Sequence, residues 1–360
     1  MITCTPPNEE LPLQPAMQQF GQNDLIRDVE PLVSILTPVY NGGLYLRECI
    51  DSVLAQTYSN WEYTIINNCS TDNTLDIAAQ YAGMDQRIRV CSYEKFLDVI
   101  SSHNRAFRLI SPKSKYCKVV SADDWLFPEC IARMVNLAEM NPSVGLVGSY
   151  QLSGGGTDWK AWRVRWASLP YPSTVILGRE VCRVRLLGGP HVAVFGAPTS
   201  LLYRADLIRR QEFFYPNSTT EADASACYQC LRDTDFGFVH QVLSYERVHP
   251  QAISETCRSL NTYKSSHLSD IINYGPTYLS TKEFEAVIKE NLSEYYEYLA
   301  VSALHFKDRA FWTYHKGRLK DLGHPFSYRR FAIALTGKIL DLLLNPKQMA
   351  EKVIARVFRG

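Results

Sequence analysis

The chain has 360 residues, of which 46% are hydrophobic and 21% charged, and its formal net charge is +1. This length exceeds the roughly 100–200 residues of a typical single domain, and the hydrophobic fraction excludes a wholly disordered protein. The balanced charge argues against a general nucleic-acid-binding protein.

Residues 1–30 are polar and contain several prolines, which predicts a loose N-terminal arm. They lack the basic and apolar regions of a secretory signal, and the sequence has no run of about 18 apolar residues that could span a membrane. We therefore expect a cytoplasmic protein whose ten cysteines stay reduced.

Apolar runs alternate with segments of helical periodicity from Pro31 to about residue 150. This alternation predicts an α/β fold in which a mainly parallel sheet is covered by helices on both faces. Ligands of such sheets bind at the carboxyl ends of the strands, so the residues after each strand are the candidates for chemistry. The expected strands are 33–36, 63–66, 88–91, 116–120 and 144–150, and the expected helices are 46–54, 75–81, 97–109 and 128–140.

The pattern changes in the second half of the chain. Residues 151–200 are less regular, and from Glu255 onward the pattern is wholly helical. We therefore expect three parts, which are an N-terminal arm (1–30), an α/β domain (31–254) and a helical C-terminal region (255–360).

Asp123 and Asp124 stand together after the strand expected at 116–120. Neighbouring carboxylates are hard oxygen ligands that suit Mg²⁺ or Mn²⁺ bridging a diphosphate, and one of them can also accept a hydrogen bond from a ribose hydroxyl. Their mutual repulsion is a further reason to expect a cation. The alternative is that this pair caps the following helix.

Two other strand ends carry polar loops. Residues 37–43 combine hydroxyls, an amide, an aromatic ring and two glycines, so Tyr40 can hold a planar base where the backbone approaches closely. Residues 67–74 follow the second strand, and their amides can read a base edge. Either segment can instead be an ordinary turn that leads into the next helix.

These three segments, in this order and spacing, resemble glycosyltransferase family 2, the inverting nucleotide-sugar transferases of the GT-A fold. Residues 33–41 and 50–58 look like that family's opening, 67–74 resembles its second motif, and 121–124 resembles its metal motif. The resemblance covers about 31–254. It implies a GT-A-type, mainly parallel sheet flanked by helices, to which a C-terminal helical extension is added.

For the nucleotide sugar, the resemblance implies a site at these strand ends. Thr37, Tyr40 and Asn68 would lie on the nucleobase, and Asp123 would hold the ribose or sugar. A UDP-sugar is the expected donor. The full predicted set is Thr37, Pro38, Tyr40, Asn41, Asn68, Asp123 and Arg247.

For catalysis, the resemblance implies that Asp124 and His249 hold Mg²⁺ or Mn²⁺, which stabilises the departing diphosphate. Asp223, with Glu221 as the alternative, would take the proton from the acceptor hydroxyl. The implied function is transfer of a hexose-type sugar, with inversion, from a nucleotide-diphosphate donor to a saccharide or lipid-linked acceptor in surface polysaccharide synthesis.

The sequence departs from the family pattern in three places. Asn67 and Asn68 stand where many members carry two aspartates, and Ser121 stands where the metal motif has an acid. The base motif is Glu221-Ala222-Asp223, where the family has Glu-Asp. An amide can donate and accept, so base contact survives, but a preference for uracil does not follow. These departures leave open a catalytically inert nucleotide-binding or scaffold module on the same fold, and a nucleotidyltransferase that releases pyrophosphate is a third alternative.

The acceptor and the C-terminal tail are less specific. Residues 326–360 carry a net charge of +5 and apolar side chains at helical spacing. This segment can lie on the cytoplasmic face of an anionic membrane, dock on the catalytic domain or pair with a second copy of the chain. Aromatic side chains that can contact an acceptor sugar, or form a core instead, are Trp159, Trp162, Trp166, His191 and Tyr203.

Overall fold

A ten-stranded sheet organises the computed structural model, which describes residues 30–155, 162–165, 174–188, 195, 197–216, 222–252, 257 and 260–344. The strand order is β3-β2-β1-β4-β9-β6-β10-β5, with β7 on β6 and β8 on β10. The strands are β1 (Val33–Val39), β2 (Trp61–Asn67), β3 (Ile88–Ser92), β4 (Tyr116–Val119), β5 (Trp125–Leu126), β6 (Val144–Gly154), β7 (Arg163–Arg165), β8 (Val175–Ile176), β9 (Leu201–Arg204) and β10 (Asp235–Arg247).

The long strands of the sheet run in one direction. β1 pairs in parallel with β2 and β4, β2 with β3, and β6 with β10. β9 lies between β4 and β6 and is antiparallel to both. The carboxyl ends of β1, β2, β4, β6 and β10 therefore gather at one edge, as the sequence predicts, although β9 makes the sheet mixed.

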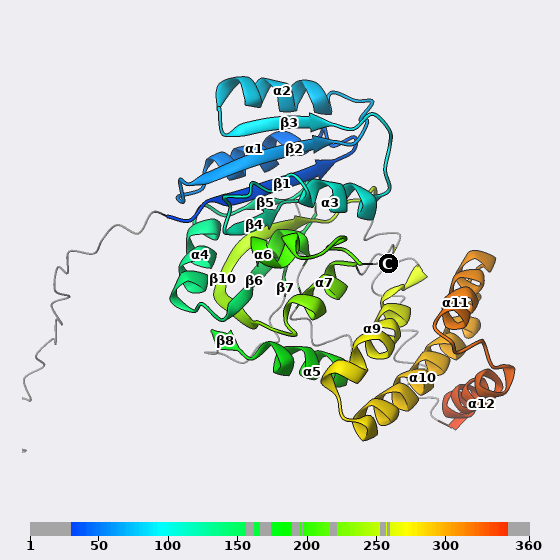
Figure 1. Cartoon of the computed structure of the whole chain (residues 1–360). Coiled ribbons are helices and arrows are strands. Elements are labelled where there is room, and N and C mark those ends of the chain that lie inside the picture. Colours follow the sequence, from blue (N-terminus) through cyan, green and yellow to red (C-terminus); the bar gives the residue numbers. More distant parts are fainter. Residues whose placement is uncertain are drawn as a thin grey trace, which may run out of the picture. The chain divides into compact units, whose positions relative to one another are not determined.

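Helices cover both faces of the sheet (Figure 1). Side chains of β1 alternate between two cores, since Ile35 packs with α1, α2 and α4, whereas Leu36 packs with α3, α5, α6 and α7. This confirms the predicted α/β class. The helices are α1 (Leu46–Leu54), α2 (Thr74–Met84), α3 (Val99–Phe107), α4 (Cys130–Met140), α5 (Gly178–Gly188), α6 (Ala205–Arg209) and α7 (Ala222–Cys230), and a short 3₁₀ turn, η3 (Pro198–Ser200), precedes β9.

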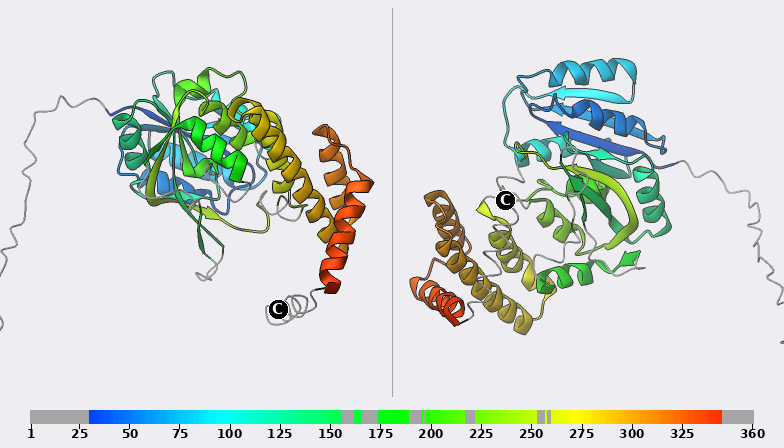
Figure 2. Two further views of the ribbon diagram at one scale, coloured as in Figure 1. Left: turned by 90° about the horizontal axis from the view of Figure 1, so that it is seen from below. Right: turned by 180° about the vertical axis from the view of Figure 1, so that it is seen from behind.

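Helices make up the C-terminal part as far as the structure describes it, which confirms the predicted helical extension. They are α9 (Tyr263–Tyr278), α10 (Thr281–Leu304), α11 (Arg309–Asp321) and α12 (Tyr328–Leu344). α9 packs on the sheet side through Ile271, α10 follows it, and α12 forms the outer layer against α10 (Figures 1 and 2). Ser280 and Glu283 form a capping box that starts α10.

Two findings bear on the predicted compartment and chemistry. None of the helices that the structure describes is long and apolar enough to cross a membrane. Nine cysteines lie in the described residues and all are free. Cys227 and Cys230, the single CxxC pair, are both buried on α7, where they pack as small apolar side chains.

Candidate active site

The carboxyl ends of the strands bring together segments that are far apart in the chain. Asp123 and Asp124 follow β4, Thr199 lies in η3, and Arg247 ends β10. Asp124 is 4% exposed, and its two carboxylate oxygens accept hydrogen bonds from the Thr199 hydroxyl at 2.7 Å and the Arg247 backbone N–H at 3.0 Å. Burial raises the pKa of Asp124 well above its usual range, and the charge of Asp123 adds to this rise.

The same geometry excludes the alternative that Asp124 caps a helix. The chain continues from Asp124 into β5, and α4 begins only at Cys130, with Glu129 at its N-cap. The buried carboxylate therefore holds the strand ends β4, η3 and β10 together.

Asp123 is the aspartate that turns outward. Its side chain is 33% exposed, and its Oδ2 lies 3.0 Å from Nε2 of His249. The structure thus places His249 against Asp123, whereas Asp124, predicted to share a metal with His249, is hydrogen-bonded inside the fold. Both Asp124 oxygens are occupied inside the fold, which leaves Asp123 to meet the histidine.

Arg247 connects this end of the site to α1. Its Nε donates to the Asp123 carbonyl at 3.0 Å, and its Nη2 donates to Glu48 at 2.5 Å. The guanidinium also lies over the rings of Tyr45, at 4.3 Å, and Trp125, at 5.1 Å. A fixed cation therefore stands beside the two aspartates.

An aromatic pair marks the other end of the site. Tyr40 is 50% exposed just after β1, and its ring meets that of Phe96 edge to face at 4.8 Å. Phe96 is 59% exposed and was missed by sequence reasoning. The available signal was a phenylalanine in the loop after the third strand, preceded by Glu94 and Lys95.

The loops behind Tyr40 are held by hydrogen bonds between β1–α1 and β2–α2. Asn41 has a φ of +50°, and its side-chain oxygen accepts from the backbone N–H of Thr71 at 2.8 Å. The backbone N–H of Gly43 donates to Asp72 at 2.9 Å. A Cβ atom on Gly43 would lie 1.9 Å from the side-chain oxygen of Asn73, so a larger residue there would have to displace the Asn73 side chain.

Thr37 and Asn68, both predicted to contact the base, have side chains that are buried and hydrogen-bonded within the fold. Thr37 is fully buried, and its hydroxyl donates to the Val120 carbonyl at 2.8 Å. Asn68 is 4% exposed, and its amide accepts from the Leu97 N–H at 3.0 Å and donates to the Leu97 carbonyl at 2.8 Å. Both side chains position loops instead. Pro38 is half-buried within β1, where it is in register with Ile66 of β2.

Asp223 lies in the first turn of α7 and is half-buried. Burial raises the pKa of two tyrosines, Tyr215 and Tyr203, well above the usual range, and the charge of Asp223 adds to both rises. Tyr203 belongs to β9, which directly follows η3, the turn that contains Thr199. Glu221 lies outside the described residues.

Of the aromatic residues predicted to contact the acceptor, some lie outside the described residues and others lie within them. Trp159, Trp166 and His191 lie outside the described residues. Tyr203 is fully buried and so cannot contact an acceptor, because β9 directs it into the core. Trp162 lies over Gly154 and 5.3 Å from the ring of Tyr245.

A divalent cation suits the donors at the outward end of the aspartate pair. Asp123 and His249 offer a carboxylate oxygen and an imidazole nitrogen, and the adjoining buried acid adds negative charge. Among the described side chains there is no cluster of three or more His, Cys, Asp or Glu that could hold a metal. Asp123 and His249 are thus the two donors that the described residues bring together at this point.

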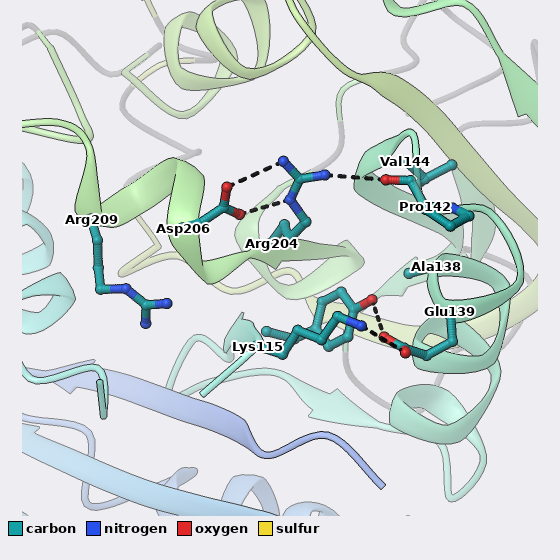
Figure 3. A pocket seen from close by; sticks show the side chains of 9 residues that line it. Lys115, Ala138, Glu139, Pro142, Val144, Arg204, Asp206 and Arg209 are labelled. Atoms are coloured by element: carbon teal, nitrogen blue, oxygen red, sulfur yellow. Dashed lines mark hydrogen bonds and ion pairs between the residues drawn. The ribbon is translucent and has the colours of Figure 1, made fainter. Parts of the chain in front are cut away.

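A separate pocket of about 340 Å³ opens at the opposite edge of the sheet (Figure 3). It is lined at the amino end of β4 by Lys115 and Tyr116 and at the end of β9 by Arg204. Lys115 pairs with Glu139, and Arg204 pairs with Asp206. These charges neutralise one another, and the pocket lies at the other end of β4 from Asp123, so we do not place the chemistry there.

Comparisons with known proteins agree with this geometry. The model of Glycosyl transferase family 2 matches residues 34–206. An uncharacterized glycosyltransferase of Rickettsia typhi is 29% identical over 228 residues, which is 63% of this chain and 67% of the relative. The putative teichuronic acid biosynthesis glycosyltransferase TuaG of Bacillus subtilis is 32% identical over 129 residues, which is 36% of this chain and half of the relative.

Solved structures share the fold. S. aureus TarS 1–349 in complex with UDP-GlcNAc has a TM-score of 0.58 at 15% identity and covers 88% of this chain and 87% of that one. The mannosyltransferase PcManGT of Pyrobaculum calidifontis, in complex with GDP-Man and Mn²⁺, has a TM-score of 0.51 at 15% identity and covers 88% and 81%. The α/β architecture is thus of the GT-A type.

Proposed function

The chain belongs to glycosyl transferase family 2 through residues 34–206, and from this premise we propose that it moves a sugar, with inversion, from a nucleotide-diphosphate donor to an acceptor hydroxyl. The acceptor is a saccharide or a lipid-linked saccharide in surface polysaccharide synthesis, as the name of the relative TuaG supports. The donors in the two structural neighbours, UDP-GlcNAc and GDP-Man, support a nucleotide sugar, and we take a UDP-sugar as the first candidate.

One observation carries the proposal, which is the contact of Asp123 with His249 beside the buried Asp124. This arrangement joins two acids, a histidine and Arg247 at one edge of the sheet, and the exposed pair Tyr40 and Phe96 lies at the same edge. A diphosphate needs positive charge at one end of such a site, and a base needs an aromatic surface at the other.

The donor is bound by this chain's residues in the following way. The base stacks on Tyr40 and Phe96. Asp123 and His249 would hold Mg²⁺ or Mn²⁺, and the cation would stabilise the negative charge of the departing diphosphate. Arg247 pairs with the exposed Glu48, and it can exchange that carboxylate for a phosphate oxygen.

The acceptor hydroxyl loses its proton to Asp223 while its oxygen attacks the anomeric carbon. The bond from that carbon to the diphosphate breaks, and the electron pair leaves on the nucleoside diphosphate. Attack from the face opposite the leaving group inverts the configuration. A positioned carboxylate base contributes about 10²–10⁴-fold to such a step.

Turnover with two variants tests these roles. The full chain is incubated with a panel of UDP-, GDP- and dTDP-sugars and Mn²⁺, and release of nucleoside diphosphate is measured. Asp123→Asn and Asp223→Asn should each lose about 10²–10⁴-fold in kcat. Only Asp123→Asn should also weaken nucleotide binding, because only that residue lies at the diphosphate. The control is Asp233→Asn, which removes a carboxylate that is 63% exposed beyond α7.

The alternative on the same fold is an inert nucleotide-binding module. Its support is that Asn68 is fully engaged with Leu97, so this part of the motif builds the loop. Nucleotide binding by calorimetry with no donor turnover across the whole panel would replace the transferase proposal with this one.

We further place the enzyme at the cytoplasmic face of the membrane, because a lipid-linked acceptor lies there. Residues 326–360, with a net charge of +5, are the segment that would make a peripheral contact.

A further inference from the structure

The outward face of α12 is apolar although it faces solvent. None of the residues of this helix is buried. Ile333 is 64% exposed, Leu340 50%, Leu343 71% and Leu344 77%. Residues 333, 340 and 344 are seven and four positions apart, so they line one side of the helix.

The opposite side of α12 is already used by the fold. Phe331 and Ala334 pack into the C-terminal core beside Leu299 of α10, and Lys338 pairs with Glu297 of α10 at 2.8 Å. The exposed leucines are therefore not required for holding α12 on the protein. An apolar face of this kind on a surface helix points to a further contact.

Charge is strongly segregated toward this end of the chain. Residues 305–360 contain twelve Lys and Arg and four Asp and Glu, a net charge of +8, although the whole chain has only +1. Arg329 and Arg330 are exposed in the first turn of α12, next to the apolar face. A second copy of this end would carry the same positive charge and repel it, whereas an anionic lipid surface attracts it.

We propose that the outward face of α12 lies on an anionic lipid bilayer, with Ile333, Leu340, Leu343 and Leu344 among the acyl chains and Arg329 and Arg330 at the headgroups. This rests on the proposed function for its purpose, since it brings the site to a lipid-linked acceptor. The contact is peripheral, because a single amphipathic helix enters only the headgroup and upper acyl region.

Sedimentation of the full chain with vesicles tests the proposal. The vesicles are phosphatidylcholine alone or phosphatidylcholine with about one third phosphatidylglycerol. We expect the chain to sediment with the anionic vesicles at low salt, to bind weakly to the neutral ones, and to be released as salt is raised, because screening weakens the attraction.

Two double variants separate the apolar and charged contributions. Ile333→Gln/Leu340→Gln should weaken partition to anionic vesicles by about tenfold or more. Arg329→Gln/Arg330→Gln should weaken it by roughly fivefold for each arginine. The matched control, Met84→Gln/Met140→Gln, changes two side chains that are 69% and 73% exposed on α2 and α4, and it should bind like wild type.

Several results would overturn the proposal. These are failure of the wild type to bind anionic vesicles, wild-type binding by Ile333→Gln/Leu340→Gln, or a dimeric mass in solution that this variant converts to a monomer. Donor turnover without vesicles is measured in parallel. If the transferase proposal fails, no variant turns over donor whatever its vesicle binding. If only the membrane proposal fails, turnover remains and vesicle binding is absent or insensitive to α12.

Discussion

The α/β part of the chain and its C-terminal helices place their apolar side chains in opposite ways. In β1, Val33, Ile35 and Leu36 are completely buried, and polar side chains appear where the strand ends. In α12, by contrast, Leu343 and Leu344 are more than two-thirds exposed. The first part uses its apolar surface for its own core and exposes polar chemistry at one edge. The outer helix α12 keeps apolar side chains exposed to solvent, and this surface is available for another contact.

Buried polar groups differ between the two parts as well. In the α/β part, Lys118 is fully buried on β4, and its Nζ donates to the carbonyls of Thr199 and Leu201. In the helical part, His315 is fully buried between the Tyr295 hydroxyl and the Leu260 carbonyl. The lysine supports the residue that holds Asp124, whereas the histidine joins helices far from the site.

Lys118→Met should give the largest change in stability, roughly 2 to 4 kcal/mol in the free energy of unfolding. The methionine fits the space but leaves the Thr199 and Leu201 carbonyls without their donor. Chemical denaturation measures this. Lys115→Met is the control, since that amine is on a 51% exposed side chain, and it should cost under about 1 kcal/mol. Equal losses of stability for the two substitutions would mean that the buried Lys118 contributes no more to folding than an exposed lysine does.

Through His315, a residue of the helical part, acid should lower the free energy of unfolding by about 2 kcal/mol. Burial lowers its pKa to about 4, below the value of 6.5 of the exposed residue. The folded state therefore binds fewer protons than the unfolded state between these values. The stability due to neutral His315 is complete above pH 6.5 and is lost as the pH falls toward 4.

Unfolding at about pH 7 and about pH 4.5 checks this expectation. The difference in stability between wild type and His315→Gln should shrink at the lower pH, because the wild type alone loses this contribution. His305→Gln, at an exposed position of the same helical part, should follow the wild type at both values. A constant difference between wild type and His315→Gln would show that the imidazole has the same pKa in the folded and unfolded states.

The spacing of apolar residues predicted the strands and helices, because this spacing depends directly on which side chains are buried. The expected strand at 63–66 became β2 at Trp61–Asn67, and the expected helix at 97–109 became α3, which starts at the N-cap Asp98. β9 was missed because Leu201–Arg204 is too short to show a period, and its place between β4 and β6 depends on pairing across more than fifty residues.

The motifs predicted where the site lies but not which atoms face it. Asp124 binds Arg247, 123 residues away, and Asn68 binds Leu97, 29 residues away. Such long-range partners decide whether a polar side chain faces inward or outward. They do not leave a periodic trace in the sequence, so the outward role of Asp123 became visible only in the fold.

Tyr40→Ala tests whether the exposed aromatic pair at the sheet edge is a binding surface, unlike the exposed leucines of α12. Nucleotide affinity should fall about tenfold, because one stacked base contributes roughly 1 to 3 kcal/mol. Calorimetry with a nucleoside diphosphate measures this. Tyr263→Ala removes a tyrosine of the same 50% exposure from α9 and should not change affinity. Unchanged affinity in Tyr40→Ala would move the base away from β1.

Leu340→Ala should give the smallest effect, less than about 0.5 kcal/mol in the free energy of unfolding without lipid. Leu340 is 50% exposed on the outward face of α12, so shortening it leaves no cavity, and alanine is an excellent helix former. Denaturation in the absence of vesicles measures this. A loss above about 1 kcal/mol would mean that the chain itself covers this face. In that case the contrast between the two parts would disappear, and with it the reason to bring α12 to a bilayer.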